Sequence, residues 1–90
     1  MIVIDTRTCP LDGWTRILGM MIRHGYSDRQ SGLAPKQRPT GNQLVAWLSI
    51  HRQVKIVNIE ERQVHDLREA YLHGWRFAEH QEDVRLGIGK

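Results

Sequence analysis

With 90 residues and one cysteine, the chain has the length of a single small domain and excludes both a disulfide framework and a cysteine-based zinc site. Apolar residues make up 40% of the sequence and charged residues 26%, and no run approaches the roughly 18 apolar residues of a membrane-spanning helix. The apolar start is too short for a signal peptide and is followed at once by Asp5. We therefore expect one globular domain over residues 1–90, with loose ends at 85–90, in the reducing cytoplasm and away from membranes.

The formal net charge of +3 is unevenly distributed along the chain. Residues 1–59 hold eight Lys and Arg against three Asp and Glu, whereas residues 60–90 hold five against seven. A basic body joined to a slightly acidic end predicts two surfaces that meet different partners. The basic surface is the one suited to phosphate groups.

The first part of the chain predicts a strand followed by a helix. Residues 1–8 open with β-branched and apolar side chains, which is typical of a short strand. Apolar residues then recur three and four positions apart between 14 and 22, which predicts a helix over about 13–24 with Asp12 as its N-cap. Gly25 predicts the end of that helix.

Two capping boxes and a β-branched run predict the next three elements. The segment 27–30 has the form of a capping box and predicts a short second helix over about 28–34, before a loop stiffened by two prolines. A second capping box, from Thr40 to Gln43, predicts a third helix to about residue 52. A β-branched run over 54–57 predicts a second strand that could pair with the first.

Asn58, followed by an acidic first turn, predicts a long last helix to about residue 81. Gly74 lies inside this helix, where it either permits close approach of another helix or is simply tolerated at a cost of about 1 kcal/mol. The predicted fold is mainly helical, of the α+β class, with about four helices, a helix-turn-helix-like middle and a minor two-stranded ribbon. The expected core consists of Trp14, Ile17, Leu18, Met21, Leu44, Leu48, Leu67, Tyr71 and Trp75.

The middle of the chain has the element order of a helix-turn-helix, whose second helix reads the major groove of DNA. On this interpretation the amides of Asn42 and Gln43 read adenine edges, and basic side chains contact phosphates. The connection with two prolines is longer and stiffer than the usual turn, so three small helices with a solvated basic loop are the alternative. The predicted nucleic-acid-binding residues are Arg29, Lys36, Arg38, Thr40, Asn42, Gln43 and Arg52.

The last helix offers two further interpretations. His65, Glu69 and His73 are spaced four apart on one face, as metal ligands could be, but no second element supplies a ligand. We therefore predict a solvated face and no metal or other cofactor. Apolar residues off the main stripe of this helix indicate either burial on two sides or contact with a partner or a second copy. The predicted partner-binding residues are Glu69, Leu72, His73, Arg76 and Phe77.

No nucleophile elbow, carboxylate pair or phosphate-cradling glycine loop occurs in the sequence, which predicts a protein that is not an enzyme. The favoured function is a small regulatory protein that binds nucleic acid, DNA rather than RNA, and forms a homodimer or contacts a protein through its last helix. The alternative is a protein-binding module or inhibitor of the kind that phages and plasmids encode, which occludes a surface of a larger host nucleoprotein complex.

Overall fold

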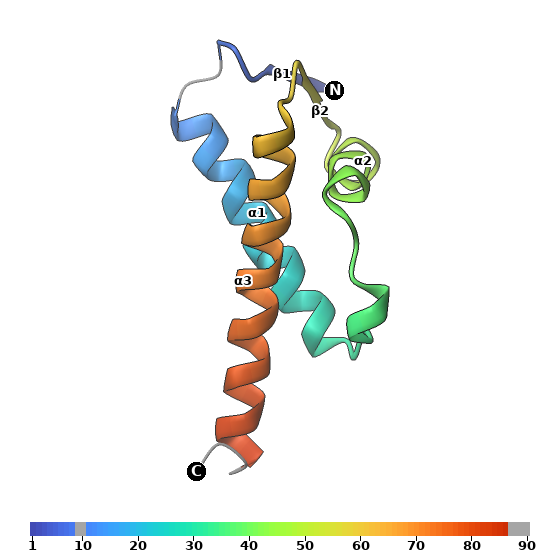
Figure 1. Cartoon of the computed structure of the whole chain (residues 1–90), viewed down its shortest axis with the longest axis vertical. Helices are drawn as coiled ribbons and strands as arrows, with labels where there is room; N and C mark the ends of the chain where they lie inside the picture. Colours follow the sequence, from blue (N-terminus) through green and yellow to red (C-terminus); the bar gives the residue numbers. More distant parts are fainter. Residues whose placement is uncertain (9–10, 87–90) are drawn as a thin grey trace.

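The computed structural model describes residues 1–8 and 11–86, so Cys9 and residues 87–90 lie outside the described residues. Of the end predicted to be loose, 85–90, the first two residues belong to the last helix. In chain order the elements are β1 (Ile2–Asp5), α1 (Leu11–Gln30), a 3-10 turn η1 (Pro35–Gln37), α2 (Gly41–His51), β2 (Val54–Val57) and α3 (Glu61–Leu86). Figure 1 shows α1 and α3 crossing along the long axis of the molecule, with α2 beside the upper half of α3. The α+β class with a minor ribbon is confirmed, but the described residues form three α-helices rather than four.

The two helices predicted over 13–24 and 28–34 are one continuous helix, α1. Gly25 does not end it, because this residue is buried in the middle of the helix against α3. The real end is a Schellman motif at Gly32, which has a φ of +85°. In this motif the N–H of Leu33 donates to the carbonyl of Asp28 at 3.1 Å, and the N–H of Gly32 donates to the carbonyl of Arg29 at 3.1 Å.

The start of α2 is the predicted capping box. The backbone N–H of Gln43 donates to the Thr40 hydroxyl at 3.2 Å, and the Thr40 N–H donates to the Gln43 side chain at 2.8 Å. The helix then directs Leu44 and Leu48 inward, and both are fully buried. Prediction and structure agree here because the signal is complete within four residues.

The start of α3 differs from the prediction. Asn58 has a φ of 57° and does not cap the helix. The capping bond runs instead from the Glu60 N–H to the side chain of Gln63 at 3.0 Å, so the helix begins at Glu61. At its other end α3 continues beyond the predicted residue 81 to Leu86.

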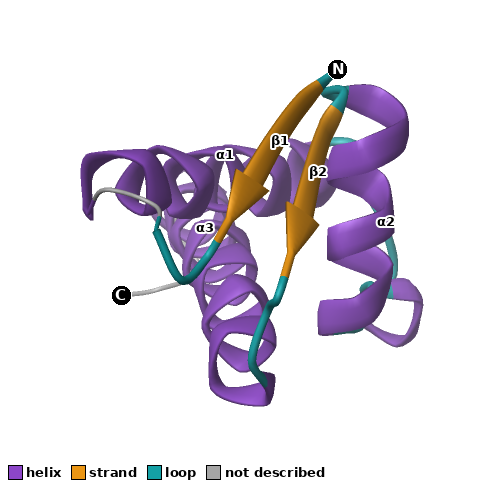
Figure 2. Ribbon diagram, turned by 90° about the horizontal axis from the view of Figure 1, so that it is seen from above, coloured by secondary structure: helices purple, strands orange, loops and turns teal. Residues whose placement is uncertain are grey.

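The two strands form a parallel ribbon in which Ile2 lies opposite Val54 and Ile4 opposite Ile56. Figure 2 shows the ribbon from above, with α2 on the outer side of β2 and α1 crossing beneath β1. The inward side chains Val54 and Ile56 are buried, at 4% and 7% exposure. The predicted pairing is therefore confirmed, and β2 connects it to the core.

Seven of the nine predicted core residues are fully buried, and the other two, Trp14 and Leu18, are partly buried against them. Leu72 was predicted to contact a partner, and this is wrong, because its side chain is 5% exposed and belongs to the core. The reason is that α3 packs against α1 on one side and against α2 on another. A helix covered on two sides buries apolar residues outside a single stripe.

Backbone-to-backbone contact between α1 and α3 depends on two glycines. A Cβ at Gly25 would collide with the carbonyl group of Tyr71, and a Cβ at Gly74 would collide with the carbonyl group of Ile22. The two positions are related across the helix crossing, where each helix fits its glycine against the backbone of the other. Gly74 is therefore required for close approach and is more than a tolerated helix residue.

We expect Gly74→Ala to lower the free energy of unfolding by about 3 kcal/mol or more, because the helices must separate to admit the new methyl group. Gly19→Ala is the matched control, since this glycine also lies inside α1 but a Cβ there meets nothing within 4 Å. We expect the control to stabilise the protein by about 0.5–1 kcal/mol through helix propensity. Urea unfolding followed by tryptophan fluorescence measures both, and equal effects would contradict the close crossing.

Candidate functional site

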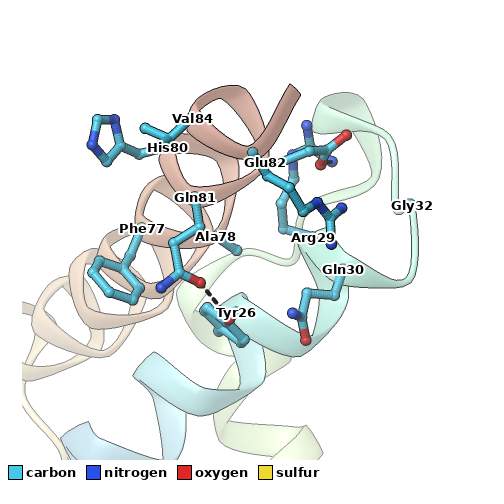
Figure 3. Close-up of a pocket in the computed structure, with 11 residues that line it drawn as sticks. Tyr26, Arg29, Gln30, Gly32, Phe77, Ala78, His80, Gln81, Glu82 and Val84 are labelled. Atoms are coloured by element: carbon cyan, nitrogen blue, oxygen red, sulfur yellow. Dashed lines mark hydrogen bonds and ion pairs between the residues drawn. The ribbon is translucent and has the colours of Figure 1, made fainter. Parts of the chain in front are cut away.

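An open groove of about 820 Å³ lies between the last turns of α1 and the C-terminal part of α3. Figure 3 shows Tyr26 and Arg29 reaching from α1 towards Phe77, Gln81 and Glu82 of α3. We call this site the terminal groove. It exists because the chain turns away at the end of α1 while α3 continues to Leu86, leaving the last turns of α3 covered on one side only.

The apolar part of the terminal groove is open to solvent. Phe77 is 52% exposed and Val84 is 60% exposed. The ring of Tyr26 lies 6.0 Å from that of Phe77, centroid to centroid, with the planes tilted by 37°. This aromatic pair and Val84 form an apolar surface that the described part of the chain leaves uncovered.

Polar contacts hold the floor of the groove. The Tyr26 hydroxyl donates to the side-chain carbonyl of Gln81, which ties the two helices together. Arg29 pairs with Glu82 at 2.7 Å and approaches Glu79 at 3.9 Å. The charges of Arg29 and Glu82 therefore compensate each other, which leaves Arg85 as the remaining formal charge among the lining residues.

The predicted nucleic-acid-binding residues have different surroundings in the structure. Arg29 is turned towards the carboxylates of α3, at the end of the molecule where the terminal groove lies. Arg38 lies over the Trp75 ring at 5.4 Å and donates from Nε to the Pro35 carbonyl at 3.0 Å. Arg52, after α2, lies over the Trp47 ring at 5.6 Å. Arg29 and Arg38 are thus occupied by contacts within the fold, whereas Arg52 lies over a ring and stays exposed.

The remaining members of that set divide into two groups. Thr40 and Gln43 bond to each other in the capping box, and Lys36 and Asn42 do not take part in it; all four residues are exposed. The connection between α1 and α2 spans residues 31–40 and includes η1, so the short turn of a helix-turn-helix is not formed there. The two prolines of this connection had already indicated a longer and stiffer link than a helix-turn-helix turn.

The predicted partner-binding residues are better grouped. Glu69, His73, Arg76 and Phe77 are all exposed and follow one another along α3 at helical spacing. Phe77 also lines the terminal groove, so this exposed face leads into it. The groove residues Tyr26, Gln81 and Val84 were not in the predicted set. Val84 is an apolar residue in a charged segment. It could have been predicted to extend the apolar face of the last helix only if that helix had been expected to continue past residue 81.

The face predicted to carry His65, Glu69 and His73 belongs to α3 alone. His65 and Glu69 form an exposed pair at 3.5 Å between Nε2 and Oε1. Within residues 1–8 and 11–86 no three His, Cys, Asp or Glu side chains are grouped to hold a metal ion. Over the same described residues, every helix is too short or too polar to cross a membrane.

A half-buried polar cluster joins the three helices on the other side of α3. The imidazole of His24 stacks on Trp47 with centroids 4.0 Å apart and planes at 16°, and meets Tyr71 edge-on at 5.2 Å. The Tyr71 hydroxyl donates to Asp28 Oδ2 at 2.6 Å, and His24 Nε2 lies 3.6 Å from the same oxygen. Burial, together with the bond to Asp28, raises the pKa of Tyr71 well above its ordinary value.

Comparison with protein-family models, with curated proteins and with solved structures finds no match to this chain. The functional argument therefore depends on geometry. Two neighbouring surfaces expose side chains that could contact a partner. They are the apolar side of the terminal groove and the exposed face of α3 that leads into it. Both are features of a binding surface.

We expect the free energy of unfolding to fall as the pH is lowered through about 6.5. Burial lowers the pKa of His24 below 6.5, against the opposing effect of Asp28 and with smaller lowering by His51 and Arg52. A lowered pKa means that the unfolded chain takes up the proton first, so stability is complete above pH 6.5 and is lost as the pH falls. One such group contributes a slope of at most about 1.4 kcal/mol per pH unit.

Denaturant unfolding between pH 8 and pH 5 measures this slope, at roughly the range where histidine titrates. His24→Phe should flatten it, because the ring can still stack on Trp47 but takes up no proton. His73→Gln is the control, since His73 is exposed and its loss should leave the slope unchanged. An unchanged slope in His24→Phe would show that other groups are responsible.

Proposed function

We propose that this protein is a non-enzymatic binding module for another protein, and that the terminal groove receives an amphipathic helical segment of that partner. The observation that supports this most is the exposed pair Phe77 and Val84 on a groove of about 820 Å³. Single apolar residues on a surface are ordinary, but several grouped at a concavity are typical of a binding site. The role agrees with an inhibitor that occludes a surface of a larger complex.

A helix is the partner element that suits this groove. The groove runs between two helices, and Phe77 and Val84 are separated by two helical turns of α3, about 10 Å along its axis. A helix laid alongside would present apolar residues at the same repeat, spaced three, four and seven apart. Tyr26, held by its bond to Gln81, provides a rigid aromatic surface at the base of the groove.

The charges of the groove favour an acidic partner. Glu82 is already paired with Arg29, and so does not attract a cation strongly. Arg85 lines the same groove and adds a positive charge to it. A partner segment with a carboxylate beside its apolar face would pair with Arg85, and rim pairs of this kind increase the association rate and the selectivity more than the affinity.

Nucleic-acid binding is the second candidate, and one observation favours it. Arg52 is exposed and lies over the Trp47 ring at 5.6 Å, with exposed His51 and Lys55 next to it in the chain. Cations beside an aromatic face suit the phosphates and bases of a single strand. This surface is smaller than the seven predicted residues would have made it, because Arg29 and Arg38 have partners inside the fold.

A selection of displayed helical peptides against the whole chain tests the proposal. Selected peptides should be amphipathic with acidic flanks, and their binding should shift the amide signals of Tyr26, Phe77 and Val84 in NMR titrations. Phe77→Ala should weaken binding at least about tenfold, because it removes the largest exposed apolar group of the groove. Ile50→Ala is the control, since Ile50 is 72% exposed on α2 and lies outside the groove.

Two results would contradict the proposal: selected peptides that bind equally well to Phe77→Ala, or peptides that shift amide signals only outside the groove. Titration with single-stranded and duplex DNA at low and high salt is run in parallel. Binding that weakens steeply with salt and is lost in Arg52→Ala, with no effect of Phe77→Ala, would establish the nucleic-acid function instead.

A further inference from the structure

We propose that two copies of this chain associate through the outer edge of β1, with the strand of one copy pairing antiparallel to the same strand of the other. The inference goes beyond the proposed function and does not depend on the terminal groove. It follows from the hydrogen-bonding pattern, the exposure and the charge of residues 1–5.

The outer edge of β1 is identified by the alternation of its hydrogen bonds. The N–H of Ile2 donates to the Gln53 carbonyl at 2.8 Å, and the N–H of Thr6 donates to the Val57 carbonyl at 3.2 Å. These even-numbered residues therefore face β2. Val3, between them, directs its N–H and carbonyl to the opposite edge, as alternate residues of a strand do.

This edge is apolar and uncovered. Met1, Ile2 and Val3 are 73%, 61% and 61% exposed, whereas the paired strand β2 buries its inward residues. Proteins normally protect a free edge with lysine, proline, a bulge or a covering helix. The sequence of β1, IVID, contains no lysine or proline, and among the described residues only β2 pairs with this strand.

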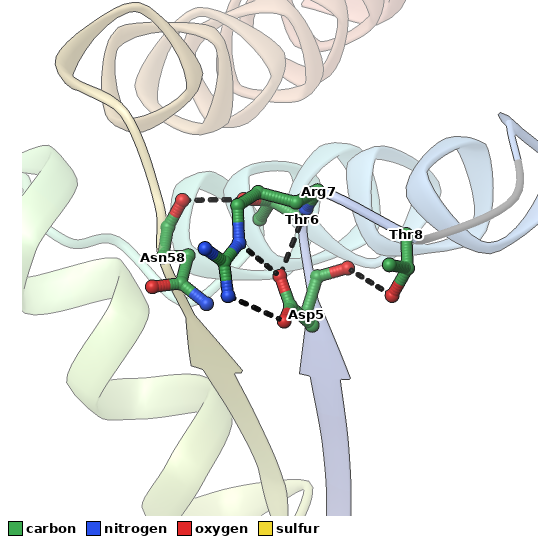
Figure 4. Close-up of polar contacts among 5 residues, drawn as sticks. All are labelled: Asp5, Thr6, Arg7, Thr8 and Asn58. Carbon is green, nitrogen blue, oxygen red and sulfur yellow. Dashed lines mark hydrogen bonds and ion pairs between the residues drawn. The ribbon is translucent and has the colours of Figure 1, made fainter.

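The strand is held in place before any pairing. Figure 4 shows the turn after β1, where the Thr6 hydroxyl donates to the carbonyl of Asn58 and the Arg7 backbone N–H donates to the Asp5 carboxylate at 2.9 Å. The N–H of Thr8 closes the turn on the Asp5 carbonyl at 3.1 Å. An edge fixed in this way loses little conformational entropy when a second strand is added.

The residues of β1 suit an antiparallel pair centred on Val3. In this register Val3 lies opposite Val3 of the second copy, and the two exchange N–H to carbonyl bonds across the two-fold axis. Ile2 then lies opposite Ile4 of the second copy, which brings apolar side chains together on the inner face. The outward N–H of Asp5 can donate to the carbonyl of Met1 of the second copy.

Charge favours the antiparallel direction. Hydrogen bonds from Arg7 lower the pKa of Asp5, so this carboxylate is charged at neutral pH, and the Arg7 guanidinium 3.3 Å away balances part of that charge. An antiparallel pair places the two Asp5 side chains at opposite ends, whereas a parallel pair in register would place them directly opposite each other. Like charges directly opposite in a sheet are destabilising.

The pairing would turn two small ribbons into one sheet of four strands. A two-stranded sheet is below the usual size, and further strands stabilise it. The strands lie at one end of a molecule 46 Å long and the terminal groove lies at the other, so the two grooves of a dimer would both stay accessible. The paired area is small, and we expect a reversible dimer that depends on concentration.

The test uses sedimentation equilibrium of the whole chain between about 1 µM and 1 mM, a range that detects weak dimers. The natural chain should shift from the mass of one copy towards that of two. Val3→Lys and Val3→Glu should each stay monomeric, because the two-fold axis places position 3 against itself. An equimolar mixture of the two variants should recover dimers through a Lys–Glu pair.

Ile50→Lys is the matched control, since it makes the same change at a residue 72% exposed on α2 and should dimerise like the natural chain. Circular dichroism shows that the Val3 variants are folded. A natural chain that stays monomeric at the highest concentration would overturn the inference, as would Val3 variants that dimerise alone. Dimers that persist in the Val3 variants but are lost in Phe77→Ala would also overturn it. Peptide binding to the groove should be unaffected by the Val3 variants, so the two proposals fail separately.

Discussion

The rest of the structure depends on the close crossing of α1 and α3 at Gly25 and Gly74. Each glycine lies against a backbone carbonyl of the other helix, at Tyr71 and Ile22, where no side chain fits. Contact at this distance lets α3 pack on α1 and still face α2, which explains why Leu72 is buried. The helices cross at an angle, so their ends move apart (Figure 1). The terminal groove lies between the last turns of α1 and the C-terminal part of α3 (Figure 3).

Most of the basic side chains that suggested a nucleic-acid surface are used inside this fold. Arg29 balances the carboxylates of the last turns of α3, and Arg38 and Arg52 cover the rings of Trp75 and Trp47. A guanidinium group on an aromatic face also covers apolar area, so these side chains contribute to packing as well as charge. The net charge of +3 is thus a property of the whole chain and does not measure one binding surface.

The two surfaces we assign to partners lie at opposite ends of an elongated molecule (Figure 1). At one end the β1 edge offers backbone groups to a second strand, and at the other the terminal groove offers Phe77 and Val84 to a helix. A dimer formed through β1 would present two grooves, and linked sites bind a partner with two matching segments far more tightly than one site does. The half-buried cluster of His24, Trp47 and Tyr71 lies between these ends and joins the three helices. Burial lowers the pKa of His24 there, which is the basis for the expected pH dependence of stability.

The sequence by itself determined the features whose cause is local. The capping box from Thr40 to Gln43, the two strands and the periodic core were predictable because each is specified within a few residues. Tertiary structure decided the rest. A glycine in a helical pattern is the same local signal whether it ends a helix or admits a neighbour, so the continuity of α1 through Gly25 depended on the position of α3. The partners of Arg29 and Tyr26 lie at least 50 positions away in the chain, and only the helix crossing brings them together to form the groove.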